Sequence, residues 1–484
     1  LIVDLNNFAS FPTLAVGILI GALRNAGYQV DVICPLAYDV PASQRERQET
    51  LYDHVARRAN LSTWRPFRMA RDAARLTRLW WVYRPHARVL RETAKSLRER
   101  PDVILLSAYL QHYQTVCEIG KLAKTLGIPM IVGGPVFNML GTAHAWRHIP
   151  GLTAIVGGEV DLVLPDIVNR VIHHQDLLKV NGVVLPDGRI ADPAAPLKNL
   201  DAVPLPDFSD FPWDRYKFRV IPLMTGRGCQ WARCTFCSDV WSASGRTFRT
   251  RSVESVLHEA REQSRRHQTS NFVFLDIKLN SNPAMLRGIV ANIQHYVHGA
   301  QWIGTVHVDQ RKDNGLSRRE LKEAVGAGMR RVSFGLESGS QRMLDLMDKG
   351  CTVEANSEFI RNAYEAGLSI RCTMFKGYPG ETSEDLEKTA DFLEHHGQYI
   401  DRIRFNEFSV HEGTPIYTTL ASEPSAFPQI VVSNWDHRNG RAKYISTSTG
   451  ERSYRRAKAK VLRAVFAINR RSVRSAAQAF DGLM

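Results

Sequence analysis

Short apolar stretches alternate with helical patterns along most of this 484-residue chain, and this alternation constrains its fold more than any other feature. Within residues 1–176, five apolar stretches have the length of strands, at 1–5, 28–34, 103–107, 130–133 and 153–156. Strands that alternate with helices form parallel sheets, because each helix returns the chain to the start of the next strand. We therefore predict a doubly wound, Rossmann-like α/β domain over 1–176, interrupted by a basic helical insert at 43–100.

The alternation resumes after a proline-rich segment. Residues 177–214 contain a short valine-rich hairpin and five prolines between positions 193 and 212, which is typical of a linker. Six further strand candidates follow within 215–420, at 220–225, 271–275, 302–308, 331–335, 369–375 and 402–408. Six consecutive strand–helix units predict an open, partial (β/α)6 barrel with its site at the carboxyl ends of the strands. Residues 421–484 lack this alternation, and we expect a small, mostly helical, basic region there.

The net charge of +14 is concentrated in two places. Residues 45–100 carry a net charge of +9 and residues 437–475 a net charge of +11, so the rest of the chain is mildly acidic. Each basic segment is either a solvated helix face or a surface for an anionic partner such as RNA, an acidic peptide or a membrane surface. A uniform nucleic-acid coat is not expected. For the aromatic stretch 79–83 in the insert we favour simple packing, with an interdomain contact, a substrate lip or a membrane-surface face as alternatives.

No apolar run is long enough to span a bilayer, and no secretory signal opens the chain, so we expect a cytoplasmic protein without a transmembrane segment. Seven cysteines in 484 residues do not make a disulfide framework. Three of them, Cys229, Cys234 and Cys237, lie in a glycine-rich loop after the first strand of the second α/β unit. Three thiolates so placed can hold a [4Fe–4S] cluster by three irons and leave the fourth iron open. A zinc site would need a fourth ligand, and no nearby His or Cys supplies it.

The cysteine loop resembles that of the radical SAM superfamily, in particular its branch with an N-terminal cobalamin-binding domain. The family loop usually reads C-x3-C-x2-C with an aromatic residue before the last cysteine, as Phe236 is here. This chain reads C-x4-C-x2-C, one residue longer in the first spacer. The resemblance implies three cofactors: a [4Fe–4S] cluster on the cysteines, S-adenosylmethionine on its open iron, and cobalamin.

Further motifs follow in the family order. Asp276 ends the second barrel strand, Glu337 and Ser338 lie in the sequence GLESGS, and Gly377 and Gly380 follow the fifth strand in GYPGE. The resemblance implies that S-adenosylmethionine is bound by Phe236 together with these five residues. A carboxylate such as Glu337 can accept hydrogen bonds from the amino or ribose groups, and glycine lets backbone approach the flat adenine.

The N-terminal domain carries the elements that the resemblance assigns to cobalamin. Asn6 occupies the position at which methionine-synthase-type domains place the histidine that coordinates cobalt, which implies no protein histidine on that face. The other implied contacts follow later strands of the same domain and are Ser107, Tyr109, Gly133, Gly134, Gly157 and Glu159. The alternative is a Rossmann-like domain for another nucleotide, although the absence of G-x-G-x-x-G after the first strand disfavours NAD.

Together these features imply a cobalamin-dependent radical SAM methyltransferase. It would methylate an unactivated carbon of a peptide or natural-product substrate through a 5′-deoxyadenosyl radical, with electrons from a flavodoxin- or ferredoxin-like donor. No acid–base catalytic residue is required, because the cofactors supply the chemistry. A cobalamin-dependent cyclase or rearrangement enzyme without net methyl transfer is one alternative, and a cobalamin-binding sensor is another. An RNA methylthiolase is disfavoured, because Cys34 and Cys117 cannot supply the three extra N-terminal cysteines of that group.

Overall fold

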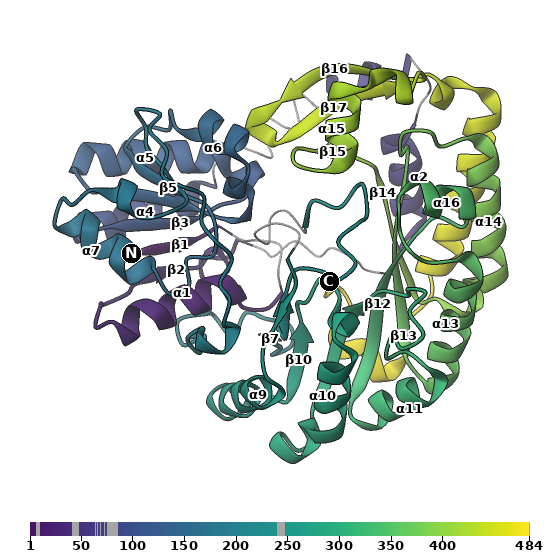
Figure 1. Cartoon of the computed structure of the whole chain (residues 1–484), viewed down its shortest axis with the longest axis horizontal. Coiled ribbons are helices and arrows are strands. Elements are labelled where there is room, and N and C mark those ends of the chain that lie inside the picture. The colour runs from purple at the N-terminus through teal and green to yellow at the C-terminus, as the bar shows by residue number, and fades with distance from the viewer. Residues whose placement is uncertain are drawn as a thin grey trace.

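The computed structural model describes residues 1–5, 10–40, 48–62, 64, 66–67, 69–71, 73–74, 86–239 and 247–483. Two α/β units lie side by side, the N-terminal one at the left of Figure 1 and the larger one at the right. The predicted cobalamin contact Asn6 and the aromatic stretch 79–83 lie outside the described residues.

The N-terminal unit is a six-stranded sheet in the order β2-β1-β3-β4-β5-β6. Its strands are β1 (Ile2–Asp4), β2 (Val32–Ile33), β3 (Ile104–Ser107), β4 (Met130–Gly133), β5 (Leu152–Val156) and β6 (Val183–Val184). The first five are parallel, and β6 runs antiparallel to β5. Buried residues on alternate positions of these strands pack into two separate cores, so helices cover both faces of the sheet. These helices are α1 (Leu14–Asn25), α4 (Ala87–Arg98), α5 (Tyr113–Leu126), α6 (Leu140–Trp146) and α7 (Leu164–Ile172).

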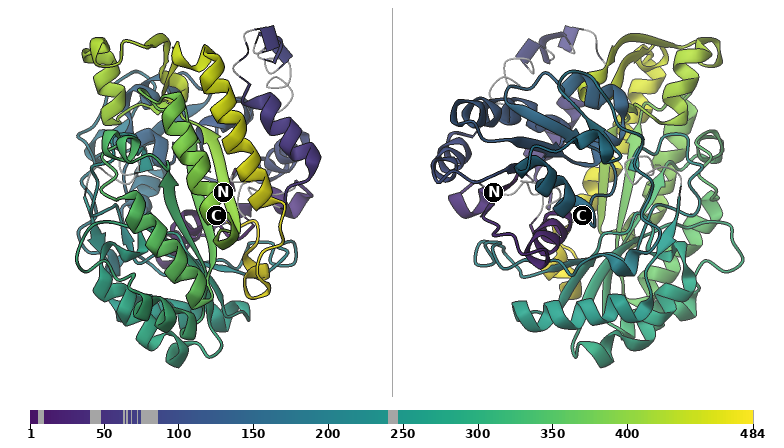
Figure 2. Two further views of the ribbon diagram at one scale, coloured as in Figure 1. Left: turned by 90° about the vertical axis from the view of Figure 1, so that its right-hand side faces the viewer. Right: turned by 60° about the vertical axis from the view of Figure 1, so that its left-hand side comes forward.

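The second unit is a curved, all-parallel sheet in the order β14-β13-β12-β11-β10-β7. Its strands are β7 (Ile221–Leu223), β10 (Asn271–Phe274), β11 (Gln301–Val306), β12 (Met329–Glu337), β13 (Ser369–Lys376) and β14 (Arg402–Glu407). Helices wrap its outer side, as Figure 2 shows, and they are α9 (Val253–His267), α10 (Pro283–Tyr296), α11 (Arg318–Gly326), α13 (Val353–Ala366) and α14 (Ser383–His396). The short α12 (Gln341–Leu346) follows β12 and packs in a separate cluster with Tyr378 and Ile416. Strand order follows chain order from β7 to β14, and within the described residues these two end strands do not pair with each other, in agreement with the predicted partial (β/α)6 barrel.

The C-terminal region contains the expected helix and also an antiparallel ribbon that the sequence did not indicate. After α15 (Pro415–Ser422), strands β16 (Ile430–Asp436) and β17 (Arg441–Ser446) pair with each other, and β17 also pairs with β15 (Val410–His411). Helix α16 (Arg452–Asn469) then packs along α14 of the barrel. In Figure 1 the ribbon crosses the top of the molecule from α6 toward the barrel.

One helix from each basic segment lies beside the other, although almost 400 residues separate the two helices in the chain. Helix α2 (Leu51–Asn60) of the insert packs beside α16, as the left view of Figure 2 shows. The ring of His54 stacks on that of Phe466 with centroids 4.5 Å apart, and the Lys458 ammonium donates a 2.7 Å hydrogen bond to the Leu61 carbonyl. Basic residues of α2 therefore adjoin those of α16, and we call the exposed cations of these two helices the basic surface; they include Arg58, Arg452, Arg456, Arg463 and Arg470.

Candidate functional site

The three clustered cysteines lie in a loop enclosed by a short ribbon. Strand β8 (Gly226–Arg227) opens the loop directly after β7, and β9 (Arg249–Thr250) closes it by pairing antiparallel with β8. All three thiols are unbridged and half-buried. Burial raises the pKa of the Cys234 thiol to about 11, and the nearby Lys349 ammonium partly offsets this effect. The loop thus presents three thiols at the carboxyl edge of the barrel sheet.

Contacts from the barrel hold the loop in place. The Thr235 amide donates a 3.0 Å hydrogen bond to the Met347 carbonyl, and the Thr235 hydroxyl shares a 2.6 Å bond with the Tyr378 hydroxyl. The Trp231 indole donates to the Asp348 carbonyl at 2.7 Å. Ala232 adopts a left-handed conformation with φ of +45°. The longer first spacer therefore contains a left-handed residue and still leaves the loop anchored on both sides of Cys234.

Asp276 supports the start of this loop. Its buried carboxylate accepts hydrogen bonds from the Thr225 amide at 3.1 Å, the Thr225 hydroxyl at 2.6 Å and the Gly226 amide at 2.9 Å. Burial raises its pKa to about 6, while the hydrogen bonds from Thr225 and Gly226 lower it. The structure thus places this predicted S-adenosylmethionine residue at the join between β7 and the cysteine loop.

Glu337 lies at a bulge in β12, where the register with β13 shifts, and its φ of +58° is left-handed. Its buried carboxylate accepts a 3.2 Å hydrogen bond from the Lys349 ammonium. Burial raises the pKa of Glu337, and the charge of Lys349 opposes that shift. Lys349 also lies 5.5 Å from the centre of the Phe236 ring. Lys349 was not predicted from the sequence, yet it connects three predicted site residues: Glu337, Phe236 and Cys234.

The remaining predicted barrel residues differ in what they face. Ser338 is buried, and its hydroxyl shares a 3.1 Å hydrogen bond with the Thr389 hydroxyl of α14. A side chain at Gly380 would come within 3.0 Å of Leu346. A side chain at Gly377, by contrast, would meet no atom within 4 Å, and the residue has a left-handed φ of +82°. Of these three residues, Gly377 alone is placed for close approach of a ligand to the backbone.

The described residues predicted to contact cobalamin lie at or just after the carboxyl ends of β3, β4 and β5. Ser107 pairs with Gly133 across these strands. A side chain at Gly134 would come within 2.3 Å of the Ala108 carbonyl oxygen, and one at Gly157 within 2.5 Å of the Phe137 carbonyl oxygen. Packing between neighbouring loops therefore requires glycine at both positions.

Two other residues of that set make specific polar contacts. The Tyr109 amide donates a 3.2 Å hydrogen bond to Nδ1 of His112. The Glu159 carboxylate accepts two 2.7 Å hydrogen bonds from Arg249 and one of 2.8 Å from the Leu197 amide. Cobalamin contacts by these residues stay a prediction, and Glu159 already has a structural role.

That role is to join the two α/β units. Arg227 and Arg249 are cross-strand partners on the β8–β9 ribbon around the cysteine loop. Arg227 donates two 2.7 Å hydrogen bonds to Asp161 and lies 3.3 Å from Glu159, whereas Arg249 pairs with Glu159. All four side chains are at most 13% exposed. The acidic loop after β5 thus forms ion pairs with the β8–β9 ribbon, which is the base of the cysteine loop. Because the partners are 66 to 90 residues apart, no local motif predicts these pairs.

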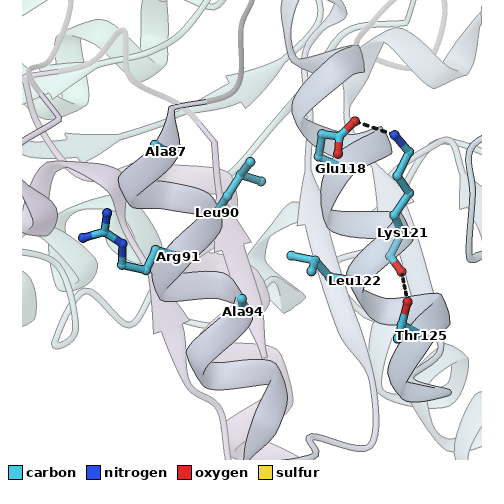
Figure 3. A pocket seen from close by; sticks show the side chains of 8 residues that line it. All are labelled: Ala87, Leu90, Arg91, Ala94, Glu118, Lys121, Leu122 and Thr125. Atoms are coloured by element: carbon cyan, nitrogen blue, oxygen red, sulfur yellow. Dashed lines mark hydrogen bonds and ion pairs between the residues drawn. The ribbon is translucent and has the colours of Figure 1, made fainter.

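A groove of about 380 Å³ lies elsewhere, between α4 and α5 on the outside of the N-terminal unit. Leu90 and Leu122 face it from the two helices, and Lys121 is paired with Glu118 at its edge, as Figure 3 shows. It lies on the outer helical layer and contains none of the predicted site residues, so we do not assign it to the site.

Comparison with known proteins identifies the barrel. Residues 223–393 match the Radical SAM superfamily. The chain therefore contains a radical SAM domain. This confirms the predicted resemblance for the barrel, and together with the methyltransferase relative it supports an enzyme. The matched segment begins in β7, includes the cysteine loop and ends in α14, so it contains every residue predicted to bind the cluster or S-adenosylmethionine.

Among curated proteins, an uncharacterized methyltransferase of Pyrococcus horikoshii is 26% identical over 325 residues, which cover 66% of this chain and 69% of that protein. The anaerobic magnesium-protoporphyrin IX monomethyl ester cyclase of Rubrivivax gelatinosus is 28% identical over 310 residues. That match covers 60% of this chain and 53% of the cyclase, so the chain spans about half the length of that relative.

Two solved structures share the whole fold. The radical SAM methyltransferase TsrM from Kitasatospora setae, with cobalamin and a [4Fe–4S] cluster bound, matches with a TM-score of 0.66 and 17% identity, covering 96% of this chain and 90% of TsrM. The cobalamin-dependent radical SAM enzyme OxsB, with aqua-cobalamin and S-adenosylmethionine bound, matches with a TM-score of 0.67 and 18% identity, covering 95% of this chain and 65% of OxsB. The match extends through both α/β units, which confirms the predicted fold class.

The cysteine loop of this radical SAM domain fits a [4Fe–4S] cluster by its chemistry, since it offers three thiols on one anchored loop. Within the described residues, no three His, Cys, Asp or Glu side chains converge as ligands of a single metal ion would. Cluster thiolates bind three different irons and need not converge on one. In the same described part of the chain, no helix is both long and apolar enough to cross a membrane.

Proposed function

We propose that this chain is a cobalamin-dependent radical SAM methyltransferase that transfers a methyl group to an unactivated carbon of a peptide or natural-product substrate. The observation that carries the proposal is the arginine–carboxylate contact between the base of the cysteine loop and the loop after β5. It fixes the predicted cluster-binding loop relative to the predicted cobalamin-binding edge. Such a fixed separation is what a reaction that uses both cofactors on one substrate requires.

The chain's own residues bind and orient the reactants. Cys229, Cys234 and Cys237 would hold the cluster and leave one iron for the amino and carboxylate groups of S-adenosylmethionine. The Gly377 turn would admit the ligand close to the backbone, and Glu337 would accept hydrogen bonds from its amino or ribose groups. The bound cofactors supply the radical and methyl-transfer chemistry. A flavodoxin- or ferredoxin-like protein would supply the electrons.

Anaerobic reconstitution tests this function. The protein is loaded with iron, sulfide and cobalamin and given S-adenosylmethionine, a reductant and candidate substrates chosen from genomic neighbours. We expect a methylated product, together with one 5′-deoxyadenosine and one S-adenosylhomocysteine per product. The triple variant Cys229→Ala/Cys234→Ala/Cys237→Ala should lose cluster absorbance and all turnover, whereas the control Cys117→Ala should retain both. A triple variant that keeps the biological function would instead indicate a cobalamin-binding sensor.

A second candidate is a cobalamin-dependent cyclase or rearrangement enzyme. The 28% identity to the magnesium-protoporphyrin cyclase over 60% of this chain favours it specifically. Product analysis separates the two. A substrate that is converted with formation of 5′-deoxyadenosine, but gains no methyl carbon and yields no S-adenosylhomocysteine, would establish the cyclase class and overturn methyl transfer.

A further inference from the structure

None of the motifs recognised in the sequence lies in the C-terminal region after residue 420, yet this region contacts the turn at Gly377. Hydrogen bonds fix the peptide groups on both sides of Gly377. Its amide donates a 2.7 Å hydrogen bond to Oε2 of Glu381, and its carbonyl accepts a 2.7 Å hydrogen bond from the Tyr444 hydroxyl of β17. These two bonds fix the orientation of the peptide groups on either side of the one predicted ligand-binding glycine that faces open space.

Glu381 is in turn held by helix α16. The hydroxyl of Tyr454 donates a 2.5 Å hydrogen bond to Oε2, the same oxygen that accepts from the Gly377 amide. Tyr454 is 1% exposed and Glu381 is 6% exposed, so water does not compete for this bond. The Gly377 amide is therefore positioned by a chain of two hydrogen bonds that begins on a helix more than 70 residues away.

The ribbon that carries Tyr444 is itself fixed at its turn. There, the Trp146 indole of α6 donates a 2.9 Å hydrogen bond to the Arg438 carbonyl, and the Thr142 hydroxyl donates one of 3.1 Å to the His437 carbonyl. The guanidinium of Arg438 also lies 5.1 Å from the centre of the Tyr113 ring. Contacts with the N-terminal unit thus hold the ribbon at one end, and Tyr444 contacts the Gly377 turn near the other.

We propose that Tyr444 and Tyr454 are positioning residues for S-adenosylmethionine, so that the C-terminal region completes this cofactor's site. The inference rests on the proposed function, because it takes the Gly377 turn as the place where the ligand meets the backbone. The hydroxyls act through the turn and not on the ligand. Removing one should let the turn relax in the free protein, so that binding has to order it again.

The test compares Tyr444→Phe and Tyr454→Phe with the control Tyr364→Phe. Each substitution keeps the ring and removes only the hydroxyl. Tyr364 lies on α13, outside the contacts with the Gly377 turn described above, and is 37% exposed. Anaerobic protein with a reconstituted cluster is titrated with S-adenosylmethionine alone by equilibrium dialysis. We expect Kd to rise about fivefold in each of the first two variants, as for loss of one ordinary hydrogen bond, and to stay unchanged in the control.

Hydrogen–deuterium exchange over residues 374–382 gives a second, ligand-free measurement. The turn should exchange faster in Tyr444→Phe and Tyr454→Phe, with cluster absorbance and cobalamin content as in the wild type. If both variants bind S-adenosylmethionine within a factor of two of the wild type, with normal exchange in the turn, the inference is overturned. If the reconstituted wild type binds no S-adenosylmethionine, it is the proposed function that fails.

Discussion

The two guanidinium amino groups of Arg227 each donate a 2.7 Å hydrogen bond to a carboxylate oxygen of Asp161, and the two residues belong to different α/β units. Arg227 lies two positions before Cys229, the first cysteine of the loop. The two side chains are 10–11% exposed, so the ion pair largely replaces the water that each charge would otherwise bind. The position of the cysteine loop is thus tied to the N-terminal unit immediately before its first thiol.

Loss of one partner should destabilise the protein. Arg227→Leu leaves Asp161 with an uncompensated buried charge, and we expect a loss of about 3 kcal/mol in the free energy of unfolding. The double variant Arg227→Leu/Asp161→Leu should recover part of this loss, because no orphaned charge remains at that pair. Thermal unfolding of anaerobically purified protein measures both. The control Arg189→Leu, which breaks an exposed pair with Asp187, should unfold like the wild type. Equal stability of Arg227→Leu and the control would contradict the tight pairing.

A second prediction concerns the extra residue in the cysteine loop. Left-handed backbone costs a residue with a side chain about 1–2 kcal/mol, whereas glycine adopts it freely. Since Ala232 has φ of +45°, Ala232→Gly should raise the thermal midpoint slightly or leave it unchanged. Ala291→Gly, at an exposed position within α10, should lower stability by about 1 kcal/mol. If both variants are destabilised alike, Ala232 is not left-handed in the folded protein.

The sequence predicted the local features of this fold well and the long-range ones poorly. The apolar stretches at 130–133 and 369–375 became β4 and β13 almost residue for residue, because buried parallel strands are nearly continuous apolar runs. The ribbon β16–β17 was missed, since its half-exposed strands mix apolar residues with Ser433, Asn434 and Lys443. Lys349 was missed for another reason. It is 12 residues after its partner Glu337, with helix α12 between them in the chain, and no sequence motif predicts a contact at that spacing.

A third prediction separates the basic surface from the site. Arg452, Arg456 and Arg463 are exposed on α16, whereas Lys458 of the same helix is buried. The triple variant Arg452→Gln/Arg456→Gln/Arg463→Gln should elute from heparin at lower salt, because fewer cations face the anionic matrix. Its rate of 5′-deoxyadenosine formation should stay at the wild-type value. If 5′-deoxyadenosine formation is lost while heparin binding is unchanged, these arginines belong to the S-adenosylmethionine site and not to the basic surface.

The last prediction concerns pH and Glu381. Burial raises the pKa of this carboxyl to about 7, while the hydrogen bonds from Tyr454 and Gly377 act to lower it. In the unfolded chain the pKa of a glutamate is about 4.3. A carboxyl whose pKa is higher in the folded state stabilises the fold while it is protonated. The stabilisation from Glu381 is therefore complete below the unfolded pKa and is lost as pH rises through 7. Glu381→Gln keeps the size and stays neutral. The thermal midpoint of the variant relative to the wild type should therefore rise between pH 6 and pH 8.

Comparing the two proteins at each pH cancels the contribution of Asp276, whose pKa of about 6 acts in the same direction. A difference that stays constant over this range, or that falls, would show that Glu381 is ionised in the folded protein at pH 6.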